Sequence, residues 1–523
     1  MNRILVCDSL EESGLALLAA SGAEVHVLTA DERPRLAEIV AGYEALIVRS
    51  STKVTADLLR AGRRLKVVGR AGIGVDNVDV PVATELGILV VNAPTANLIS
   101  ATEHTFALLL SLLRQVPAAD ASMKRGEWDR KSYVGSELFG KTVGVIGFGR
   151  IGQGVAARAR SFEAEVLAHD PYLDSAVARR LGVEPVELSE LLARADIVTL
   201  HTPFTPETRN LLSADNLRQM KAGSYLINCA RGGIVDEAAL VELLDAGHLA
   251  GAGVDVFVEE PPTSFALAQH PKVVATPHIG AQTHEAQERI AQETARMLIA
   301  ALAGSLAVSA VNLPFRPAGA AGEPYLLLAE RLGRLASALA GGSLTELKVD
   351  LWGIDEGLRP ALAVAALKGA LSPFLPEGVN YVNAERLAKD RGIAVVVSAH
   401  SVAADYPQLV RVALAGANTA IELAGALVGD RDPRVVSIDG FQLEFRPEGR
   451  ILWLRNQDVP GVVGKLGTFL GQAGVNIAGI HLARHDSARA MAVLHLDSAP
   501  PEGVLRQLAE LPEVQMVRFV DMG

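Results

Sequence analysis

Cysteines, basic residues and long apolar runs are all scarce in this chain. Only Cys7 and Cys229 occur among 523 residues, too few for a disulfide framework or a cysteine-based zinc site, and we expect no metal site. Lysine and arginine number 49 against 60 acidic residues, and the formal charge of −11 argues against non-specific nucleic-acid binding. Apolar stretches such as 106–113 and 361–367 end at a charged residue before they could span a bilayer.

The N-terminus does not predict a signal peptide. Residues 3–8 read as a β-strand, without the basic region and the longer apolar core that a signal peptide needs. The rarity of cysteine also fits a reducing compartment. We therefore expect a cytoplasmic protein that has neither a membrane nor a nucleic acid as its partner.

The length predicts several domains, because one core ordinarily serves about 100 to 200 residues. Strand-like runs alternate with helical stretches twice, which is typical of parallel sheets. The first series of strands is expected at 4–7, 24–28, 45–48, 66–69 and 89–92, and the second at 143–146, 165–169, 196–200, 224–228, 253–257 and 273–275. An apolar helix over 100–113 joins the two series, and a helical pattern over 283–302 returns the chain to the first.

These patterns predict the α/β class, with two Rossmann-like, doubly wound units. The first is a discontinuous substrate-binding unit of residues 1–97 and 283–313, and the second is a nucleotide-binding unit of residues 98–282. We expect the active groups on the loops that follow the strands, because open parallel sheets bind ligands at the carboxyl ends of their strands.

A glycine-rich fingerprint opens the second unit. Gly147, Gly149 and Gly152 follow the apolar strand 143–146 and precede a helical pattern. A lone motif of this kind also arises by chance or as a tight turn, but Asp170 ends the next strand about 20 residues further on, where an acid can bind the ribose hydroxyls. Its carboxylate would repel a 2′-phosphate, which favours NAD, while the nearby Arg150 leaves NADP as an alternative.

Three loops of the second unit carry groups suited to a 2-hydroxy acid. Arg231 can make the bidentate contact that a carboxylate favours, and His278, stiffened by Pro277, can take a hydroxyl proton beside Glu260. Each residue also has a structural alternative. Arg231 could pair with Asp236 or Asp255, Glu260 could be a solvated helix cap, and His278 could serve only as a hydrogen-bonding group in a turn.

The composition changes after residue 314. Residues 318–322, Ala-Gly-Ala-Ala-Gly, read as a linker to an α+β module over 314–449. Its helices are expected at 326–339 and 360–371, and its strands at 346–351, 394–397, 408–414 and 435–438. The last module, 450–523, has the ferredoxin-like order βαββαβ, with strands at 451–454, 477–482, 490–496 and 514–519 and helices at 462–473 and 503–511.

Six segments of the first two units carry a family resemblance. They are 48–55, 69–77, 92–97, 147–152, 228–233 and 277–281. With them the chain resembles the NAD-dependent D-2-hydroxyacid dehydrogenases, in the long form with an intervening regulatory domain and a terminal ACT domain. The resemblance implies that Arg231 binds and orients the substrate, that His278 is the acid/base and that Glu260 is its partner.

The resemblance also implies the cofactor and substrate contacts. For NAD these are Gly147, Gly149, Arg150, Ile151, Gly152, Asp170, Thr202, Cys229, Asp255 and Gly280. For the substrate they are Arg49, Arg70, Gly72 and Asn97, although Arg49 or Arg70 could instead pair with a surface acid. Ile73 stands where relatives often carry threonine, so a hydroxyl contact is in question there.

The extra cations imply a phosphorylated substrate. The reaction implied is oxidation of 3-phospho-D-glycerate to 3-phosphohydroxypyruvate, the first step of L-serine biosynthesis. The alternatives are a reductase of 2-oxoglutarate, hydroxypyruvate or glyoxylate on the same scaffold, and a scaffold that senses NAD without turnover. Arg130 and Lys131, with Trp128, resemble a segment that reaches into a neighbouring subunit, which implies a homodimer or homotetramer.

The last module resembles an ACT domain, an amino-acid-binding regulatory unit. The expected effector is L-serine, held between subunits by Asn456, Asp458 and Asn476 in two facing loops. The alternative is that these residues only favour turns and caps, and that the module serves oligomerisation alone. An anion-binding role is open for the module before it, with Arg446 and Arg450 as candidate contacts.

Overall fold

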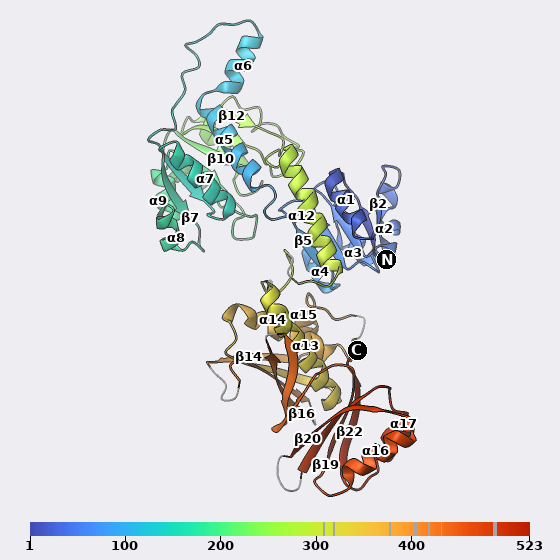
Figure 1. Ribbon diagram of the computed structural model, residues 1–523. Coiled ribbons are helices and arrows are strands. Elements are labelled where there is room, and N and C mark those ends of the chain that lie inside the picture. The colour runs from blue at the N-terminus through green and yellow to red at the C-terminus, as the bar shows by residue number, and fades with distance from the viewer. Residues whose placement is uncertain are drawn as a thin grey trace.

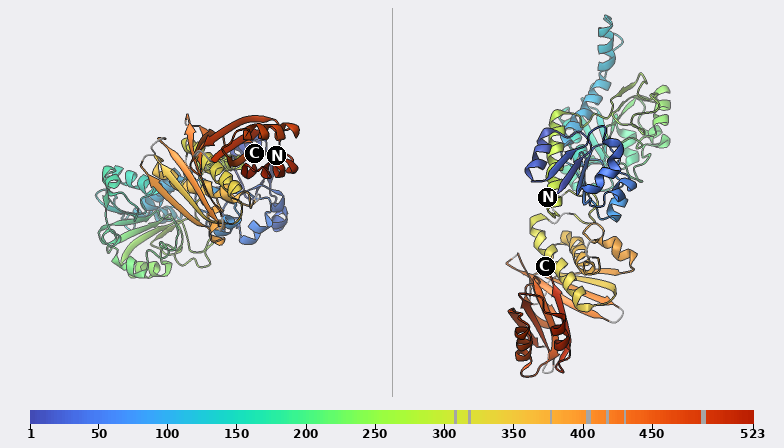
Figure 2. Two further views of the ribbon diagram at one scale, coloured as in Figure 1. Left: turned by 90° about the horizontal axis from the view of Figure 1, so that it is seen from below. Right: turned by 90° about the vertical axis from the view of Figure 1, so that its right-hand side faces the viewer.

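Four β-sheets follow one another along the chain. The computed structural model describes residues 1–306, 309–316, 319–375, 378–401, 406–416, 419–429, 431–484 and 489–523. In Figure 1 the two parallel sheets lie at one end, the third sheet in the middle and the fourth, in red, at the other end. The right view of Figure 2 shows the same elongated arrangement from another side, and the left view shows it from below.

The first sheet has five parallel strands in the order β2-β1-β3-β4-β5. They are β1 (Arg3–Val6), β2 (Glu24–Val27), β3 (Ala45–Val48), β4 (Val67–Arg70) and β5 (Leu89–Asn92). The helices are α1 (Glu12–Ala20), α2 (Leu36–Ile39), α3 (Ala56–Ala61) and α4 (Val80–Glu85), with the 3-10 turns η1 (Arg33–Arg35) and η2 (Val40–Gly42). The central strand β3 is buried at all four positions, which explains its continuous apolar run.

A later segment of the chain completes this first unit. Helix α12 (His284–Leu302) packs against α1, β4 and β5 (Figure 1). Its N-terminus is capped by Thr283, whose side chain accepts from the amide of Ala286. Beyond the helix, the amide of Val311 donates to the carbonyl of Val90 at 2.8 Å. The chain therefore returns to the first sheet after the second, while the exact domain boundaries stay predictions.

The second sheet has seven parallel strands in the order β12-β11-β10-β9-β6-β7-β8. They are β6 (Thr142–Ile146), β7 (Glu165–His169), β8 (Glu184–Pro185), β9 (Ile197–Leu200), β10 (Ser224–Asn228), β11 (Leu249–Val254) and β12 (Val273–Ala275). The helices are α5 (Leu98–Leu113), α6 (Val116–Lys124), α7 (Arg150–Ser161), α8 (Ser175–Arg180), α9 (Leu188–Arg194), α10 (Ala214–Gln219) and α11 (Glu237–Asp245).

One strand of this sheet differs from its prediction. A strand was expected over 253–257, but β11 begins at Leu249 and ends at Val254. Gly251 and Gly253 let this strand lie close to α5, since a Cβ on Gly251 would come within 2.9 Å of Leu112 and one on Gly253 within 3.2 Å of Leu108. The chain thus leaves the sheet before the buried Asp255, whose carboxylate accepts side-chain and backbone hydrogen bonds outside the sheet.

The third sheet has six strands in the order β14-β13-β15-β16-β17-β18, with only β13 and β14 parallel. They are β13 (Leu344–Trp352), β14 (Ala394–His400), β15 (Leu409–Gly416), β16 (Ala420–Val428), β17 (Asp432–Ile438) and β18 (Phe441–Phe445). The helices are α13 (Gly319–Ala340), α14 (Arg359–Leu371) and α15 (Ala384–Asp390), with the 3-10 turn η3 (Glu356–Leu358).

The expected linker at 318–322 is wrong for its described residues. Gly319 begins α13, and the helix continues through Pro324. Helix α13 packs tightly against α14, because a Cβ on Gly333 or Gly369 would come within about 2 Å of a backbone carbonyl of the other helix. Helix packing, which the local composition does not show, therefore overrides the loop-like sequence.

The fourth sheet is antiparallel in the order β20-β21-β19-β22, which confirms the expected βαββαβ module. Its elements are β19 (Arg450–Gln457), α16 (Val462–Gln472), β20 (Ile477–Arg484), β21 (Arg489–Leu496), α17 (Glu502–Ala509) and β22 (Val514–Asp521). One face packs under the two helices, and Ile451, Trp453 and Val493 on the other face join the core of the third sheet. Among the residues described, no helix is both long and apolar enough to cross a membrane.

Candidate active site

The side chain of Arg231 connects the unit of the second sheet with the unit of the first. It follows β10 in a loop held by Asn228, whose side chain accepts from the Ala230 amide and donates to the Arg231 carbonyl at 3.0 Å each. The Arg231 Nε donates at 3.1 Å to Asp76 Oδ2, which lies beyond β4 of the first unit. Its guanidinium also lies against Gly74, where a Cβ would come within 2.0 Å of it. Arg231 therefore pairs with neither of the acids considered from the sequence.

The structure brings His278 and Glu260 together. His278 Nδ1 and Glu260 Oε2 are 2.6 Å apart, and Glu260 Oε1 accepts from the Phe257 amide at 3.2 Å. Partial burial works against ionisation of Glu260, but the hydrogen bond and charge of His278 outweigh it, so the pKa of Glu260 lies below its ordinary value. Glu260 is thus a bound carboxylate and not a helix cap, and the other nitrogen of His278 is left for a ligand.

A buried aspartate holds the turn that carries His278. His278 has a left-handed backbone, φ +54°, which a residue other than glycine adopts only when its surroundings fix it. Asp255, 1 % exposed, accepts from the Ile279 and Gly280 amides at 2.8 Å each and from Thr276 Oγ1 at 2.6 Å. These bonds and His104, 3.2 Å away, outweigh burial and lower the pKa of Asp255. The carboxylate therefore fixes the turn as an anion.

The glycine loop after β6 is built for a close approach. Gly147 has φ +89°, and a Cβ there would lie 2.7 Å from the His201 carbonyl. A Cβ on Gly152 would lie 2.1 Å from the Gly147 oxygen, whereas Gly149 faces open space. Gly149 caps α7, whose first amides point outward. The loop therefore has the backbone donors and the clearance that a pyrophosphate needs.

The surroundings of this loop also fit a dinucleotide. Asp170 Oδ2 accepts from the Phe148 amide at 2.8 Å, which brings the carboxylate to the end of β7 beside the glycines. Thr202 packs against Gly147, and its buried Oγ1 has no hydrogen-bond partner among the described residues. Burial raises the pKa of Cys229 to about 12, so that thiol stays protonated. An unsatisfied buried hydroxyl is the kind of group that a bound ligand completes.

The substrate-binding candidates of the first unit lie at the ends of β3, β4 and β5. Arg70 is half-buried, and burial together with the charge of Arg231 lowers its pKa to about 10. Its Nε has no partner in the part of the chain that the structure describes, and neither does Oδ1 of Asn97. Gly72, φ +142°, leaves room for the Arg70 side chain. We name the region that Arg49, Arg70 and Asn97 share with Arg231, Glu260 and His278 the cleft. Two unsatisfied polar groups therefore lie on the first unit's side of it.

Arg49 stands beside them without an acidic partner for its guanidinium in the described residues. Its amide donates to Asp8 Oδ2 at 2.6 Å, while Nη1 lies only 3.5 Å from the Ser9 oxygens. Ile73 has no side-chain hydroxyl to donate at this point. Its carbonyl accepts from the Asn92 side chain at 2.7 Å, and this hydrogen bond fixes the loop. The surface ion pairs considered for Arg49 and Arg70 are absent from the described residues.

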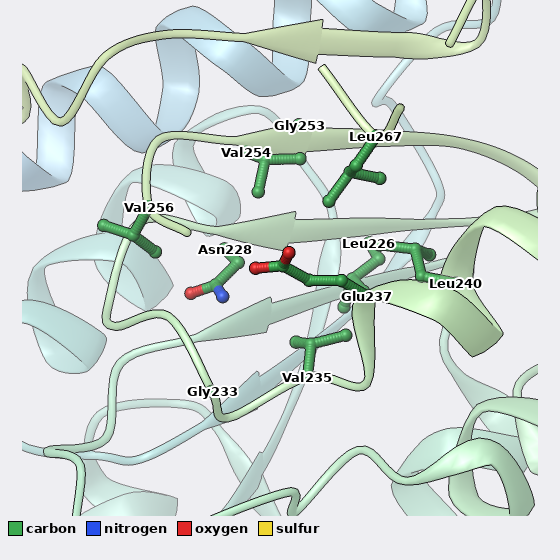
Figure 3. A pocket seen from close by; sticks show the side chains of 10 residues that line it. All are labelled: Leu226, Asn228, Gly233, Val235, Glu237, Leu240, Gly253, Val254, Val256 and Leu267. Carbon is green, nitrogen blue, oxygen red and sulfur yellow. The ribbon is translucent and has the colours of Figure 1, made fainter. Parts of the chain in front are cut away.

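A small cavity lies behind the Arg231 loop. It measures about 10 Å³ for the centre of a water-sized sphere, about enough for one water. Figure 3 shows Asn228 and Glu237 directed into it, and neither Arg231 nor His278 lines it. Burial raises the pKa of Glu237, which accepts from the Val258 amide at 2.8 Å. The cavity belongs to the support of the loop and not to the cleft.

The effector candidates do not meet within one chain. Asn456 is the penultimate residue of β19 and lies opposite Ala490, whereas Asn476 precedes Ile477, which lies opposite Leu496. The two asparagines are thus at opposite ends of the sheet, about 20 Å apart at 3.3 Å per residue. Asp458 pairs with Arg484 at 2.9 Å, and Asn476 donates to Asp497 at 2.7 Å. A site that uses both loops needs a second chain.

The remaining candidates lie elsewhere. Arg446 pairs with Asp432 at 3.0 Å, and Arg450 donates to the Asp497 carbonyl at 2.6 Å. Arg130, Lys131 and Trp128 lie exposed after α6, which projects from the second unit in Figures 1 and 2. None of them contacts the cleft of its own chain through a recorded hydrogen bond or ion pair of the described residues.

Three residues of the cleft were not expected as site residues from the sequence: Asp76, His104 and Thr276. His104 Nε2 lies 3.0 Å from Thr276 Oγ1, so α5 reaches under the His278 turn. Its position was a usable signal, since a histidine inside the apolar run 100–113 needs a polar partner. Asp76 gave none, because an acid in a loop is ordinary.

Comparison with known proteins agrees with this geometry. Residues 106–280 match the NAD-binding domain of the D-isomer specific 2-hydroxyacid dehydrogenases. The D-lactate dehydrogenase of Aquifex aeolicus, solved with NAD and lactic acid, is 29 % identical with a TM-score of 0.52, over 58 % of this chain and 96 % of that one. The fold and the cleft thus define an NAD-dependent dehydrogenase of 2-hydroxy acids.

The rest of the chain narrows the class. Residues 322–439 match the D-3-phosphoglycerate dehydrogenase intervening domain, and residues 451–513 match the ACT domain. The D-3-phosphoglycerate dehydrogenases of Methanocaldococcus jannaschii and Bacillus subtilis are 41 % and 39 % identical, each over the full length of both chains. The chain belongs to the D-3-phosphoglycerate dehydrogenase family.

Proposed function

We propose that the protein oxidises 3-phospho-D-glycerate to 3-phosphohydroxypyruvate with NAD, in the pathway to L-serine. The observation that carries the proposal is the position of Arg231, whose charge acts both on the unsatisfied Arg70 and on Glu260, the partner of His278. The full-length relatives named D-3-phosphoglycerate dehydrogenase support the substrate.

Each group of the cleft has a separate task. Arg231 exchanges Asp76 for the substrate carboxylate and orients the C2 hydroxyl toward His278. The Nε2 of His278 takes the hydroxyl proton, and the Glu260 carboxylate at Nδ1 stabilises the imidazolium that forms. NAD, when bound, accepts the hydride from C2. In the reverse direction His278 returns the proton to the carbonyl oxygen.

Residues of both units are assigned to binding. For NAD these are Gly147, Gly149, Arg150, Ile151, Gly152, Asp170, Thr202, Cys229, Asp255 and Gly280. Asp255 is 1 % exposed and accepts a hydrogen bond from the Gly280 amide. We therefore expect it to act on the nicotinamide indirectly, by fixing the turn that carries His278. For the substrate we assign Arg70 and Arg49 to the phosphate, with Gly72 and Asn97 beside it, because two cations suit a dianion.

A steady-state assay tests the substrate. NADH oxidation is measured with 3-phosphohydroxypyruvate, hydroxypyruvate, glyoxylate and 2-oxoglutarate. We expect kcat/KM at least about 100-fold higher for the phosphorylated acid than for hydroxypyruvate, because a buried arginine left without an anion loses a charge-assisted hydrogen bond. Equal efficiency on hydroxypyruvate would exclude the phosphate assignment. An Arg70→Gln variant that keeps the preference would exclude Arg70, with exposed Arg60→Gln as the control.

The assignment of L-serine as effector rests on the ACT module. Because Asn456 and Asn476 lie at opposite ends of one sheet, the proposed site takes Asn456 and Asp458 from one subunit and Asn476 from another. This requires a homodimer or homotetramer, which the exposed segment after α6 also supports, since Trp128 is 77 % exposed. The cytoplasmic location stays a prediction from the sequence.

A further inference from the structure

The third sheet module carries an open groove that the reaction does not use. The groove lies between α14, α15 and the edge strand β14 and has a volume of about 260 Å³. Val364 and Leu367 from α14, Ala388 from α15, and Ile393 form an apolar floor, all of them buried. A concave apolar surface of this size lies just below the range of drug-sized sites, which starts at about 300 Å³, and suits a smaller molecule.

Two opposite charges stand at this groove. Glu385 and Lys389 both line it from α15, four residues apart. This spacing ordinarily favours an ion pair on a helix. On the same helix Arg386 and Asp390 are paired at 3.6 Å, yet in the described residues neither Glu385 nor Lys389 has a recorded ion pair or hydrogen bond through its side chain.

The carboxylate of Glu385 is also partly desolvated. Burial raises its pKa, and no neighbouring cation or hydrogen-bond donor opposes this effect in the described residues. A cationic group placed in the groove would therefore be favoured at Glu385 and would leave Lys389 for an anionic group. One ligand that carries both charges next to an aliphatic chain satisfies the whole groove.

We propose that this groove binds an apolar α-amino acid such as leucine or valine. Its ammonium group pairs with Glu385, its carboxylate pairs with Lys389, and its aliphatic side chain covers Val395, which lines the groove from β14 and is 39 % exposed. The long side chains of two residues at this helical spacing start about 5 to 6 Å apart, which lets them reach the two charged groups of one amino acid. A polar amino acid such as serine would leave the Val395 side chain exposed.

The groove is connected to the substrate-binding unit through α15. Arg386, on that helix, pairs with Glu85 at the end of α4 at 3.3 Å. Asn380 donates to the Gly87 carbonyl at 2.6 Å, and only Ile88 separates Gly87 from the strand β5. That strand ends at Asn92, which holds the loop beside Arg70. Binding at α15 therefore acts on the segment that carries the substrate loop.

Isothermal titration calorimetry on the full-length protein tests the site without turnover, so its failure is distinct from failure of the proposed reaction. We expect L-leucine and L-valine to bind. We expect 4-methyl-2-oxopentanoate, which lacks the ammonium group, and 3-methylbutylamine, which lacks the carboxylate, to bind about 10- to 100-fold more weakly. Equal binding of the three leucine-like ligands, or no binding of leucine, would overturn the proposal.

Variants place the binding in this groove. The double variant E385Q/K389Q should lose leucine binding by a similar factor, while the matched control E502Q/R506Q, an exposed pair of the same spacing on α17, should keep it. Unchanged leucine binding in E385Q/K389Q would overturn the proposal. Arg386→Gln should keep leucine binding but abolish any leucine-dependent change in the KM for 3-phosphohydroxypyruvate. A leucine effect that persists in that variant would overturn the route through α15.

Discussion

The loops that carry the candidate residues lie at one edge of the second sheet but at opposite ends of the fourth. In the parallel second sheet, Arg231, Glu260 and His278 follow β10, β11 and β12 and share one edge, so they converge although they are far apart in the sequence. In the antiparallel fourth sheet, β19 and β20 both pair with β21 and run in the same direction. The loop after β19 and the loop before β20 therefore lie at opposite ends.

This difference decides what a residue pattern can predict. Residues that follow parallel strands can be placed in one site from strand order alone. Residues flanking a β-α-β segment of an antiparallel sheet need the register and, here, a second chain. The predictions below test the convergence in the second sheet first and the separation in the fourth sheet last.

Removing the imidazole should have the largest effect. For His278→Asn we expect kcat to fall about 1,000-fold, because general acid–base catalysis is lost, with the Kd for NADH within about twofold of wild type. Stopped-flow and steady-state assays of NADH oxidation measure both. His284→Asn, at the exposed start of α12, is the matched control. A variant that retains a tenth of the turnover or more would mean that His278 is not the acid/base.

Arg231→Lys tests the fork geometry while keeping the charge. The KM for 3-phosphohydroxypyruvate should rise about 100-fold, because an ammonium group does not replace a bidentate guanidinium. The Kd for NADH should stay unchanged. Arg218→Lys, which changes an exposed arginine paired with Asp215, is the control. An unchanged KM would mean that the loop after β10 does not bind the substrate.

Glu260→Gln should lower kcat about 10-fold, because the carboxylate that stabilises the imidazolium is gone. The lowered pKa of Glu260 also predicts a stability effect. Its contribution is present above the ordinary pKa of a glutamate, about 4, and is lost as the pH falls through the lower value of the folded protein.

Thermal unfolding between pH 3 and pH 8 measures the second effect. The difference in Tm between the wild type and the variant should be constant at neutral pH and should shrink under acid. Glu259→Gln changes the neighbouring carboxylate, which accepts from Thr263 at 2.7 Å, and should leave kcat unchanged. A Tm difference that grows on acidification would contradict the ion pair.

The smallest effect concerns the separated loops of the fourth sheet. Asn456→Ala and Asn476→Ala should each abolish the response to L-serine while leaving kcat unchanged. When the two variants are mixed and refolded or co-expressed, each mixed interface should contain one intact site and one site with both substitutions. About half of the response per mixed interface should then return. No recovery in the mixed protein would contradict a site shared between subunits.

The sequence predicted the parallel units best, because buried strands such as 45–48 and 224–228 are short apolar runs bounded by loops. It missed β16, whose run Ala420–Val428 is rich in alanine and leucine, residues with high helix propensity. Pairing with β15 and β17 overrides that propensity. The first turn of α13 was missed for a similar reason, since its helical state depends on the packing of α13 against α14.

The candidate site was predicted in its residue types and not in its contacts. Arg231, Glu260 and His278 could be placed at strand ends, but the pairing of Arg231 with Asp76 depends on how the two units meet. The bond from Asp255 to the His278 turn depends on β11 ending at Val254, earlier than the sequence suggested. Long-range packing, which no local pattern contains, decides both.

The ion pair between Arg231 and Asp76 has a consequence for product release. Asp76 offers the guanidinium a carboxylate at 3.1 Å, so a bound acid has to compete with a group of the protein itself. The net affinity is then the difference between two similar bonds and not the whole of one. When the product leaves, Arg231 pairs with Asp76 again, so the guanidinium always has an anionic partner. The affinity for the substrate is therefore lower, and the rate of product dissociation is higher.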